Sequence, residues 1–285
     1  RRTHCSDMRK PSTKLPIHDR QRELLAGATE HRYKDLGGGE GLQLHVYAPQ
    51  TGAEQPCPAI VFFYGGGFWE RGELSQFAPQ CLQLAERGMV AILADYRLGK
   101  NRGVSPLDGV EDALDAVGWI AANAERLGID AGKIVVGGAS SGAHVPLAAT
   151  MPEDGIEPAA LVLFSPIVNA VRESVIDLFG DKKTAKSVSP LHLIRKGLPP
   201  MIIFHGAEDR VQPVGDVETF ARKVLRKKNH CEMNLFMGER SSYFNFNVNA
   251  EMYESTLNAV DDFLVRQGIL ASGAGGGATT RLDSR

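Results

Sequence analysis

Apolar residues along this chain gather into short continuous runs, which alternate with longer stretches of helical spacing. Short continuous runs are typical of strands covered on both faces of a parallel sheet. They predict strands over 59–64, 89–94, 134–137, 160–164 and 201–204, followed by a last strand over 231–237. Apolar positions at helical spacing predict helices over 74–87, 106–127, 143–149, 214–228 and 250–267.

Strands that alternate with helices in this way predict an α/β fold with a mostly parallel central sheet and helices on both faces. Residues 42–47 alternate apolar and polar side chains, which predicts a half-exposed edge strand. Residues 171–197 combine weak periodicity with high charge and predict an irregular or helical excursion. We expect one domain over 31–270, a basic flexible arm over 1–30 and a disordered glycine-rich tail over 271–285.

The composition is that of an ordinary globular protein, with 43% hydrophobic and 23% charged residues and a net charge of −2. This charge balance favours neither a nucleic acid nor an anionic membrane as partner. No apolar run approaches the roughly 20 residues of a membrane span. The four cysteines are scattered without a metal-binding pattern, so the sequence predicts neither a metal, a cofactor nor a disulfide framework.

The compartment stays open at this stage. The sequence begins at Arg1 without a signal-like apolar stretch, so a leader either was removed or never existed. A soluble protein of the cytoplasm and a secreted one are both compatible with the chain. A homodimer is an assembly that the sequence leaves open.

A candidate nucleophile lies where the strand over 134–137 turns into the next helix. Residues 138–142 read Gly-Ala-Ser-Ser-Gly, a match to the G-x-S-x-G pattern. A strand that turns sharply into a helix holds the middle serine clear of the sheet, and the helix N-terminus favours developing negative charge there. We therefore predict that Ser140 is the nucleophile; the alternative is a glycine-rich turn with a capping serine.

The donors for an oxyanion are predicted from a second glycine run. Gly65-Gly66-Gly67 directly follows a buried strand, where backbone without side chains can bring N–H groups to an oxygen. We predict oxyanion donors at Gly66 and Gly67, with the N–H of Ser141 as their partner. A flexible glycine turn is the alternative for this run.

A carboxylate that could orient a catalytic base follows the strand over 201–204. Asp209 lies about 70 residues after Ser140, which fits the chain order serine, acid, histidine. Glu208 is the neighbouring competitor, and a surface salt bridge is the alternative role. The carboxyl ends of parallel strands share one edge of a sheet, so these loops are expected to form one crevice.

Four segments together resemble the α/β-hydrolase superfamily, in particular its hormone-sensitive-lipase-like and feruloyl- or acetyl-xylan-esterase-like carboxylesterases. They are Tyr64-Gly65-Gly66-Gly67-Phe68, Asp95-Tyr96-Arg97-Leu98, residues 138–144 and residues 205–211. The resemblance covers roughly residues 33–270 and implies an α/β-hydrolase fold acting on small-molecule esters with short acyl groups, among them carbohydrate acetyl or feruloyl esters. Tyr64 stands where many members have histidine, but the backbone supplies the hydrogen bonds of this motif.

The general base of the family has no match in this chain. Members follow the last strand with a segment like Gly-x-Gly-His-Gly-Phe-Phe-Asn, whereas residues 238–245 read Gly-Glu-Arg-Ser-Ser-Tyr-Phe-Asn. Aligned on Gly238 and on the aromatic pair with its asparagine, Ser241 occupies the histidine position. A serine hydroxyl cannot accept a proton near neutral pH as an imidazole can. The resemblance therefore implies an impaired triad of Ser140, Asp209 and Ser241.

The remaining histidines are weak substitutes for the missing base. His230 precedes the last strand and belongs to the opposite end of the sheet, and His45 and His192 have no motif support. His144 and His205 are nearer to the site, but neither stands at the base position of the family. Two hypotheses follow: an esterase whose base was replaced, naturally or by engineering, or a pseudo-hydrolase that binds a small ligand without turnover.

Overall fold

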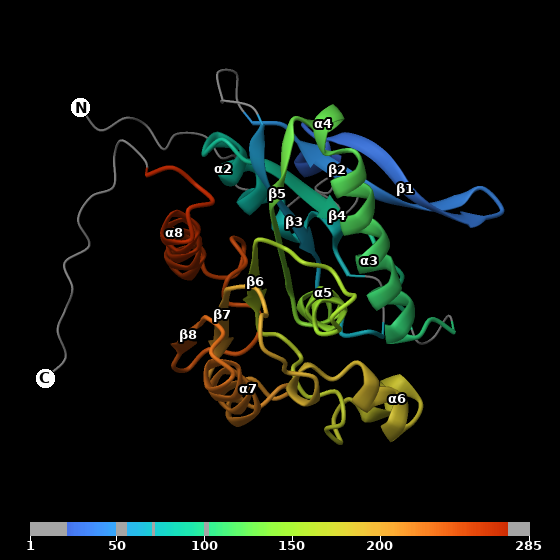
Figure 1. The fold of residues 1–285 in the computed structure, drawn as a ribbon, viewed down its shortest axis with the longest axis vertical. Helices are drawn as coiled ribbons and strands as arrows, with labels where there is room; N and C mark the ends of the chain where they lie inside the picture. Colours follow the sequence, from blue (N-terminus) through green and yellow to red (C-terminus); the bar gives the residue numbers. More distant parts are fainter. Residues whose placement is uncertain (1–21, 50–55, 70–71, 100–102, 273–285) are drawn as a thin grey trace, which may run out of the picture.

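A single mixed sheet forms the centre of the computed structural model, which describes residues 22–49, 56–69, 72–99 and 103–272 (Figure 1). The strands are β1 (Thr29–Gly37), β2 (Glu40–Tyr47), β3 (Cys57–Phe63), β4 (Val90–Ala94), β5 (Ile129–Ala139), β6 (Ala160–Phe164), β7 (Met201–Gly206) and β8 (Cys231–Phe236). Their order across the sheet is β1-β2-β4-β3-β5-β6-β7-β8.

The sheet is parallel from β4 across to β8 and antiparallel only where β2 pairs with β1 and with β4. This confirms the predicted mostly parallel sheet and the α/β-hydrolase fold. Because β3, β5, β6 and β7 run in one direction, their carboxyl ends meet at one edge. The loops that follow β3, β5, β7 and β8 carry the predicted site residues.

Helices cover both faces of the sheet, as predicted. Their bounds are η1 (Leu74–Phe77), α2 (Ala78–Glu86), α3 (Pro106–Ala122), α4 (Ala124–Leu127), α5 (Ser141–Thr150), α7 (Val214–Arg226) and α8 (Ala250–Arg266). Buried side chains of α3, α5 and α7 belong to one apolar cluster, and those of α2 and α8 to the other. The helices therefore form two layers with the sheet between them (Figure 1).

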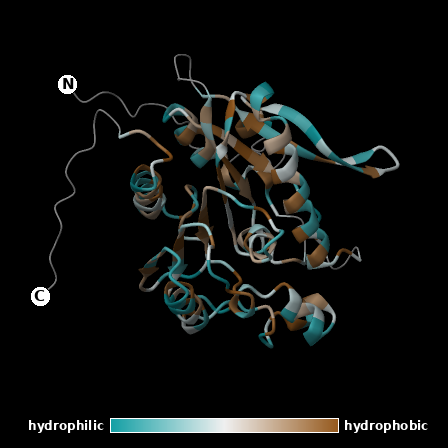
Figure 2. Cartoon of the chain, in the orientation of Figure 1, coloured by the Kyte–Doolittle hydropathy of each residue, from teal (hydrophilic) through white to brown (hydrophobic). Residues whose placement is uncertain are grey.

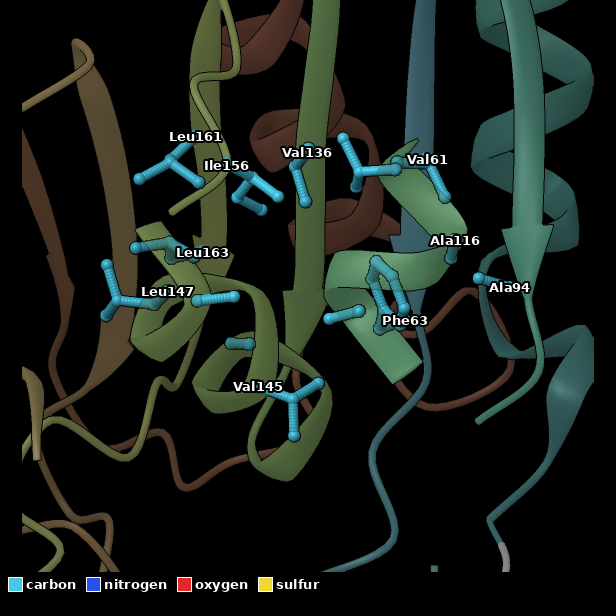
Figure 3. Packing of buried hydrophobic residues seen from close by; sticks show 14 of the residues in the cluster. Val61, Phe63, Ala94, Ala116, Val136, Val145, Leu147, Ile156, Leu161 and Leu163 are labelled. Atoms are coloured by element: carbon cyan, nitrogen blue, oxygen red, sulfur yellow. The ribbon is translucent and has the colours of Figure 1, made fainter. Parts of the chain in front are cut away.

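The core follows from the alternation of side chains along each strand. In β3, Val61 and Phe63 face the α3 and α5 side, whereas Ile60 and Phe62 face the α2 side. Figure 3 shows Val61 and Phe63 together with the helix side chains Ala116 and Val145 of the same cluster. Burial on both faces explains why this strand reads as a continuous apolar run, and the central strands are mostly hydrophobic in Figure 2.

The amino-terminal part of the sheet differs from the prediction. β2 was expected to be an edge strand, but it pairs with both β1 and β4, so β1 is the edge. β1 escaped prediction because most of its side chains are polar and exposed, without a buried face to mark it.

The described part of the domain begins before the predicted boundary at residue 31. Residues 22–25 are helical, and the Tyr47 hydroxyl donates to the carbonyl of Leu24 at 2.8 Å. Leu24 and Leu25 also pack against the core, so the chain joins the domain before residue 31. Most of the predicted arm (1–21) and of the predicted tail (273–285) lies outside the described residues.

The predicted excursion between β6 and β7 is present. It contains the short elements η3 (Ile176–Phe179), α6 (Lys182–Ser187) and η4 (Pro190–His192), separated by irregular backbone. Within the described ranges, no helix is long and apolar enough to cross a membrane.

Candidate active site

Ser140 occupies a strained turn between β5 and α5. Its backbone has φ 52° and ψ −116°, a region that non-glycine residues rarely adopt and that often marks a functional constraint. The turn is tight, because a Cβ on Gly138 would overlap the carbonyl oxygen of Gly142. The Ser140 N–H donates to the Phe164 carbonyl at 2.9 Å, which fixes the turn to β6. The predicted strand, turn and helix are therefore all present, with Ser140 at the apex.

The glycine run after β3 lies directly against this serine. A Cβ placed on Gly65 would be 3.5 Å from the Cβ of Ser140. One residue further, the Gly66 N–H donates to Ser141 Oγ at 2.9 Å. The two segments that should form an oxyanion site are thus in direct contact.

A buried hydroxyl network supports that contact. Ser141 Oγ lies 3.2 Å from the Tyr96 hydroxyl, which itself donates to the Tyr64 carbonyl at 2.7 Å. The Tyr64 hydroxyl in turn donates to Asp95 Oδ1 at 2.9 Å. Tyr64, at the position where many relatives have histidine, therefore connects the glycine run to the segment that follows β4.

The three predicted oxyanion donors are not equivalent. The N–H of Gly66 is engaged by the Ser141 hydroxyl, whereas the N–H groups of Gly67 and Ser141 have no acceptor among the described residues. Ser141 is the first residue of α5, where backbone N–H groups lack intrahelical partners and the helix dipole favours an anion. Of the three predicted donors, Gly67 and Ser141 are therefore the two whose N–H groups are not already bonded within the described residues.

Asp209 lies in the loop after β7, where its carboxylate accepts hydrogen bonds from backbone N–H groups. Its Oδ1 accepts the N–H groups of Val211 at 2.8 Å and Gln212 at 3.0 Å, which leaves Oδ2 for another partner. Asp209 is 8% exposed, whereas the neighbouring Glu208 is exposed to solvent. Burial and orientation therefore favour Asp209 over Glu208 as the carboxylate of the site.

Ser241 belongs to the loop that follows β8, and this loop packs on the loop of Asp209. The Glu208 N–H donates to the Glu239 carbonyl at 2.9 Å, and a Cβ on Gly206 would overlap the carbonyl oxygen of Arg240. Gly206 is thus needed for this close approach. Ser241, the next residue, is half-buried.

The same loop is also anchored beside Ser140. The ring of Phe244 lies 4.5 Å from that of Phe164, whose carbonyl accepts the Ser140 N–H. Phe244 also stacks on Phe77, with ring centroids 5.5 Å apart. The loop of Ser241 therefore contacts the surroundings of both Asp209 and Ser140, as the motif alignment requires.

Neither nearby histidine is bonded to the candidate nucleophile. His144 Nδ1 is 2.7 Å from the Ile167 carbonyl, and its ring lies edge-on to Phe68 and Phe179. His205 Nε2 is 2.9 Å from the Gln212 carbonyl. Within the described part of the chain, no hydrogen bond joins either imidazole to Ser140.

Burial keeps both of these imidazoles neutral. Loss of solvent lowers the pKa of His144 to about 4, against a smaller opposing effect of its hydrogen bond to Ile167. Burial likewise lowers the pKa of His205, although the Asp209 carboxylate opposes the change. Both imidazoles are therefore buried, hydrogen-bonded to backbone carbonyls and lowered in pKa, which is typical of histidines that stabilise the fold.

Three further histidines lie near polar side chains elsewhere in the fold. His45 Nδ1 lies 3.7 Å from Glu30 Oε1, His192 Nδ1 is 2.8 Å from the Ser189 hydroxyl, and His230 Nε2 is 3.1 Å from Glu232 Oε1. Among the residues that the structure describes, no cluster of His, Cys, Asp and Glu could hold a metal ion.

Sequence reasoning missed a glutamine in the wall of the site. The Gln76 side chain contacts both Gly65 and Asn245, beside a cavity of about 220 Å³ that Ser242 also lines. No motif marks Gln76, because its partners are distant in sequence. Asn245 was noted in the alignment, but only as a landmark for Ser241.

Comparison with known proteins points to ester hydrolases. The profile of the BD-FAE family matches residues 44–180. The structure of Thermogutta terrifontis esterase Est2 with propionate bound is 37% identical, covers 88% of this chain and 98% of its own, and superposes with a TM-score of 0.80. The butyrate-bound structure of the same esterase is 36% identical, with 88% and 98% coverage and a TM-score of 0.79.

A curated relative agrees at lower identity. Esterase LipC of Mycobacterium tuberculosis is 22% identical over 225 residues, which are 68% of this chain and 55% of LipC. The chain spans about half the length of the first curated relatives that it matches.

Proposed function

This chain belongs to the α/β-hydrolase superfamily of hormone-sensitive-lipase-like and feruloyl-esterase-like proteins, and we propose that it is a serine carboxylesterase impaired by loss of its general base. In this proposal Ser140 is the nucleophile and Asp209 the orienting acid. Ser241 occupies the position of the base.

The observation that carries the proposal is the Ser140 turn together with the donors around it. The Ser140 hydroxyl stands at the apex of a strained strand-to-helix turn, and the N–H groups of Gly67 and Ser141 have no acceptor among the described residues. Such donors stabilise the oxyanion of an acyl-transfer intermediate. The Gly66 N–H donates to the Ser141 hydroxyl, and this hydrogen bond holds the glycine run in place. Gly66 could donate to an oxyanion only if the oxyanion displaced that hydroxyl.

The impairment follows from proton transfer. Attack by the Ser140 hydroxyl requires a group that accepts its proton and later delivers it to the leaving alcohol. Ser241 cannot accept that proton, and His144 and His205 are engaged with backbone carbonyls. Among the described residues, no hydrogen bond joins the Asp209 carboxylate to an imidazole, and its Oδ1 accepts only backbone N–H groups.

Short acyl esters are the proposed substrates. The support is the similar Thermogutta esterase, whose structures hold propionate and butyrate. The rings of Phe68 and Phe179 pack edge-on against His144, which lies one helical turn after Ser140. Carbohydrate acetyl or feruloyl esters are included in the proposed class through the family match.

The missing base also favours a second candidate function, a pseudo-hydrolase that binds a small ester or carboxylate in the same cleft without turnover. An acceptor group is absent from the base position, but the oxyanion donors and the acid are retained. Binding and catalysis therefore make opposite predictions for the unchanged chain.

A chain-length series of p-nitrophenyl esters tests the proposal. Acetate, butyrate and decanoate esters are assayed with the unchanged chain, with Ser241→His and with Ser241→Ala. We expect turnover of the acetate and butyrate esters only with Ser241→His. Tight binding of propionate or butyrate by the unchanged chain, with no gain of turnover in Ser241→His, would favour the pseudo-hydrolase.

A further inference from the structure

Gln76 connects two loops of the site through the two ends of one carboxamide. It lies in η1 and is half-buried. Its Oε1 accepts the Gly65 N–H at 2.8 Å, and its Nε2 donates to Asn245 Oδ1 at 3.2 Å. Asn245 completes the arrangement by donating from Nδ2 to the Ser242 carbonyl at 3.1 Å.

Each end of this bridge holds a segment that the proposed chemistry uses. Gly65 begins the glycine run and lies against Ser140. Asn245 belongs to the loop of Ser241, and its partner Ser242 is the residue after that position. A second hydrogen bond reaches this loop from Gln80, whose Nε2 donates to the Phe244 carbonyl at 3.4 Å. Among the described residues, Gln76 is the side chain whose hydrogen bonds reach both loops.

We propose that Gln76 is a positioning residue that couples the oxyanion loop to the loop of the base position. Its catalytic consequence rests on the proposed function, whereas the coupling itself does not. Oxyanion donors and base must act on the same tetrahedral centre, and a displacement of about 1 Å can cost on the order of 100-fold in rate. A glutamine that is hydrogen-bonded to both loops keeps the oxyanion donors and the base position at a fixed separation.

Two substitutions separate the two ends of the bridge. Gln76→Met has a similar length and removes both hydrogen bonds. Gln76→Glu keeps an acceptor for Gly65 but sets an oxygen against Asn245 Oδ1. Gln83→Met, a change of the same chemistry on α2, is the matched control.

Amide hydrogen exchange of the unchanged protein and these variants tests the coupling without any need for turnover. Loss of one net hydrogen bond corresponds to about a fivefold faster exchange. We expect at least that increase at Gly65 and across 242–249 in Gln76→Met, and across 242–249 alone in Gln76→Glu. Asn245→Ala should also accelerate exchange at Gly65, because the bridge transmits the change.

Exchange at Gly65 that is unaffected by Asn245→Ala would overturn the coupling, as would equal effects of Gln76→Met and Gln83→Met.

A second measurement tests the catalytic consequence of the coupling in the Ser241→His background. There Gln76→Met should lower kcat by about 10- to 100-fold with little change in KM. If Ser241→His is active and the added Gln76→Met substitution leaves kcat unchanged, the positioning role is contradicted. If Ser241→His has no turnover, the proposed function fails, and hydrogen exchange alone decides the coupling.

Discussion

The backbone N–H of Glu208 donates to the carbonyl of Glu239 at 2.9 Å and joins the loop of Asp209 to the loop of Ser241. Asp209 follows Glu208 directly, and Ser241 lies two residues after Glu239. The loops of Asp209 and Ser241, which are 32 positions apart in the sequence, are therefore in contact at the edge of the sheet. This contact is the reason to expect that an imidazole at position 241 would reach Asp209.

Ser140 should be the residue that reacts with a serine-directed fluorophosphonate. In the Ser241→His background we expect labelling at Ser140, because the new imidazole activates the hydroxyl at the apex of the turn. Peptide mapping by mass spectrometry identifies the site. Ser140→Ala should abolish the label and Ser141→Ala should retain it; a label on Ser141 would refute the assignment.

Asp209→Asn should abolish most of any turnover restored by Ser241→His. The substitution keeps an oxygen for the Val211 and Gln212 N–H groups but removes the charge that orients and stabilises an imidazolium. The expected loss in kcat is about 10⁴-fold. Glu208→Gln, a neutralisation of the exposed neighbour, is the control and should retain kcat within a few-fold. Equal losses in both variants would show that Asp209 is not the orienting acid.

Ser141→Ala should destabilise the fold, whatever the state of the base. It removes the acceptor of the Gly66 N–H and one partner of the Tyr96 hydroxyl in a fully buried place. A buried donor left unpaired costs about 1–3 kcal/mol, so the free energy of unfolding in urea should fall by that amount. Ser242→Ala, at an exposed serine, should change it little. No difference between the two variants would contradict the hydroxyl network.

His144 should make stability depend on pH in the acidic range. Its pKa of about 4 in the folded state lies below the ordinary 6.5 of an unfolded chain. The unfolded state therefore binds a proton first as the pH falls below 6.5, and stability is lost progressively down to about pH 4. The slope from this one group is about 1.4 kcal/mol per pH unit.

Urea unfolding at several pH values between 7.5 and 4.5 measures this dependence. His144→Asn keeps a donor for the Ile167 carbonyl but cannot titrate, so its free energy of unfolding should fall less steeply with pH. His230→Asn, at an exposed imidazole, is the control. The same slope in unchanged protein and His144→Asn would show that His144 titrates normally in the folded state.

The parts of the site that could be predicted from sequence are those encoded locally. The Ser140 turn is a strand, two close glycines and a helix within a few residues, and Asp209 follows a buried strand that is visible as an apolar run. The parallel order of these strands then brings both to one edge. The same reasoning could not find β1, whose polar side chains have no periodic buried face.

The parts that could not be predicted depend on contacts between distant segments. The Gly66 N–H is satisfied by the hydroxyl of Ser141, 75 residues later, and Gln76 reaches Asn245 across 169 residues. Neither pairing leaves a local pattern. The sequence could name Gly66 as a candidate donor, but only the fold shows that its N–H already has an acceptor.

The most direct test of the account is the steady-state hydrolysis of p-nitrophenyl butyrate by the unchanged chain, Ser241→His and the double variant Ser140→Ala/Ser241→His. Loss of a triad member typically removes about 10⁴ to 10⁶ of the rate. We predict negligible turnover by the unchanged chain, a gain of several orders of magnitude in Ser241→His, and loss of that gain in the double variant. Substantial turnover by the unchanged chain, or no gain in a folded Ser241→His protein, would contradict the claim that a missing base limits this site.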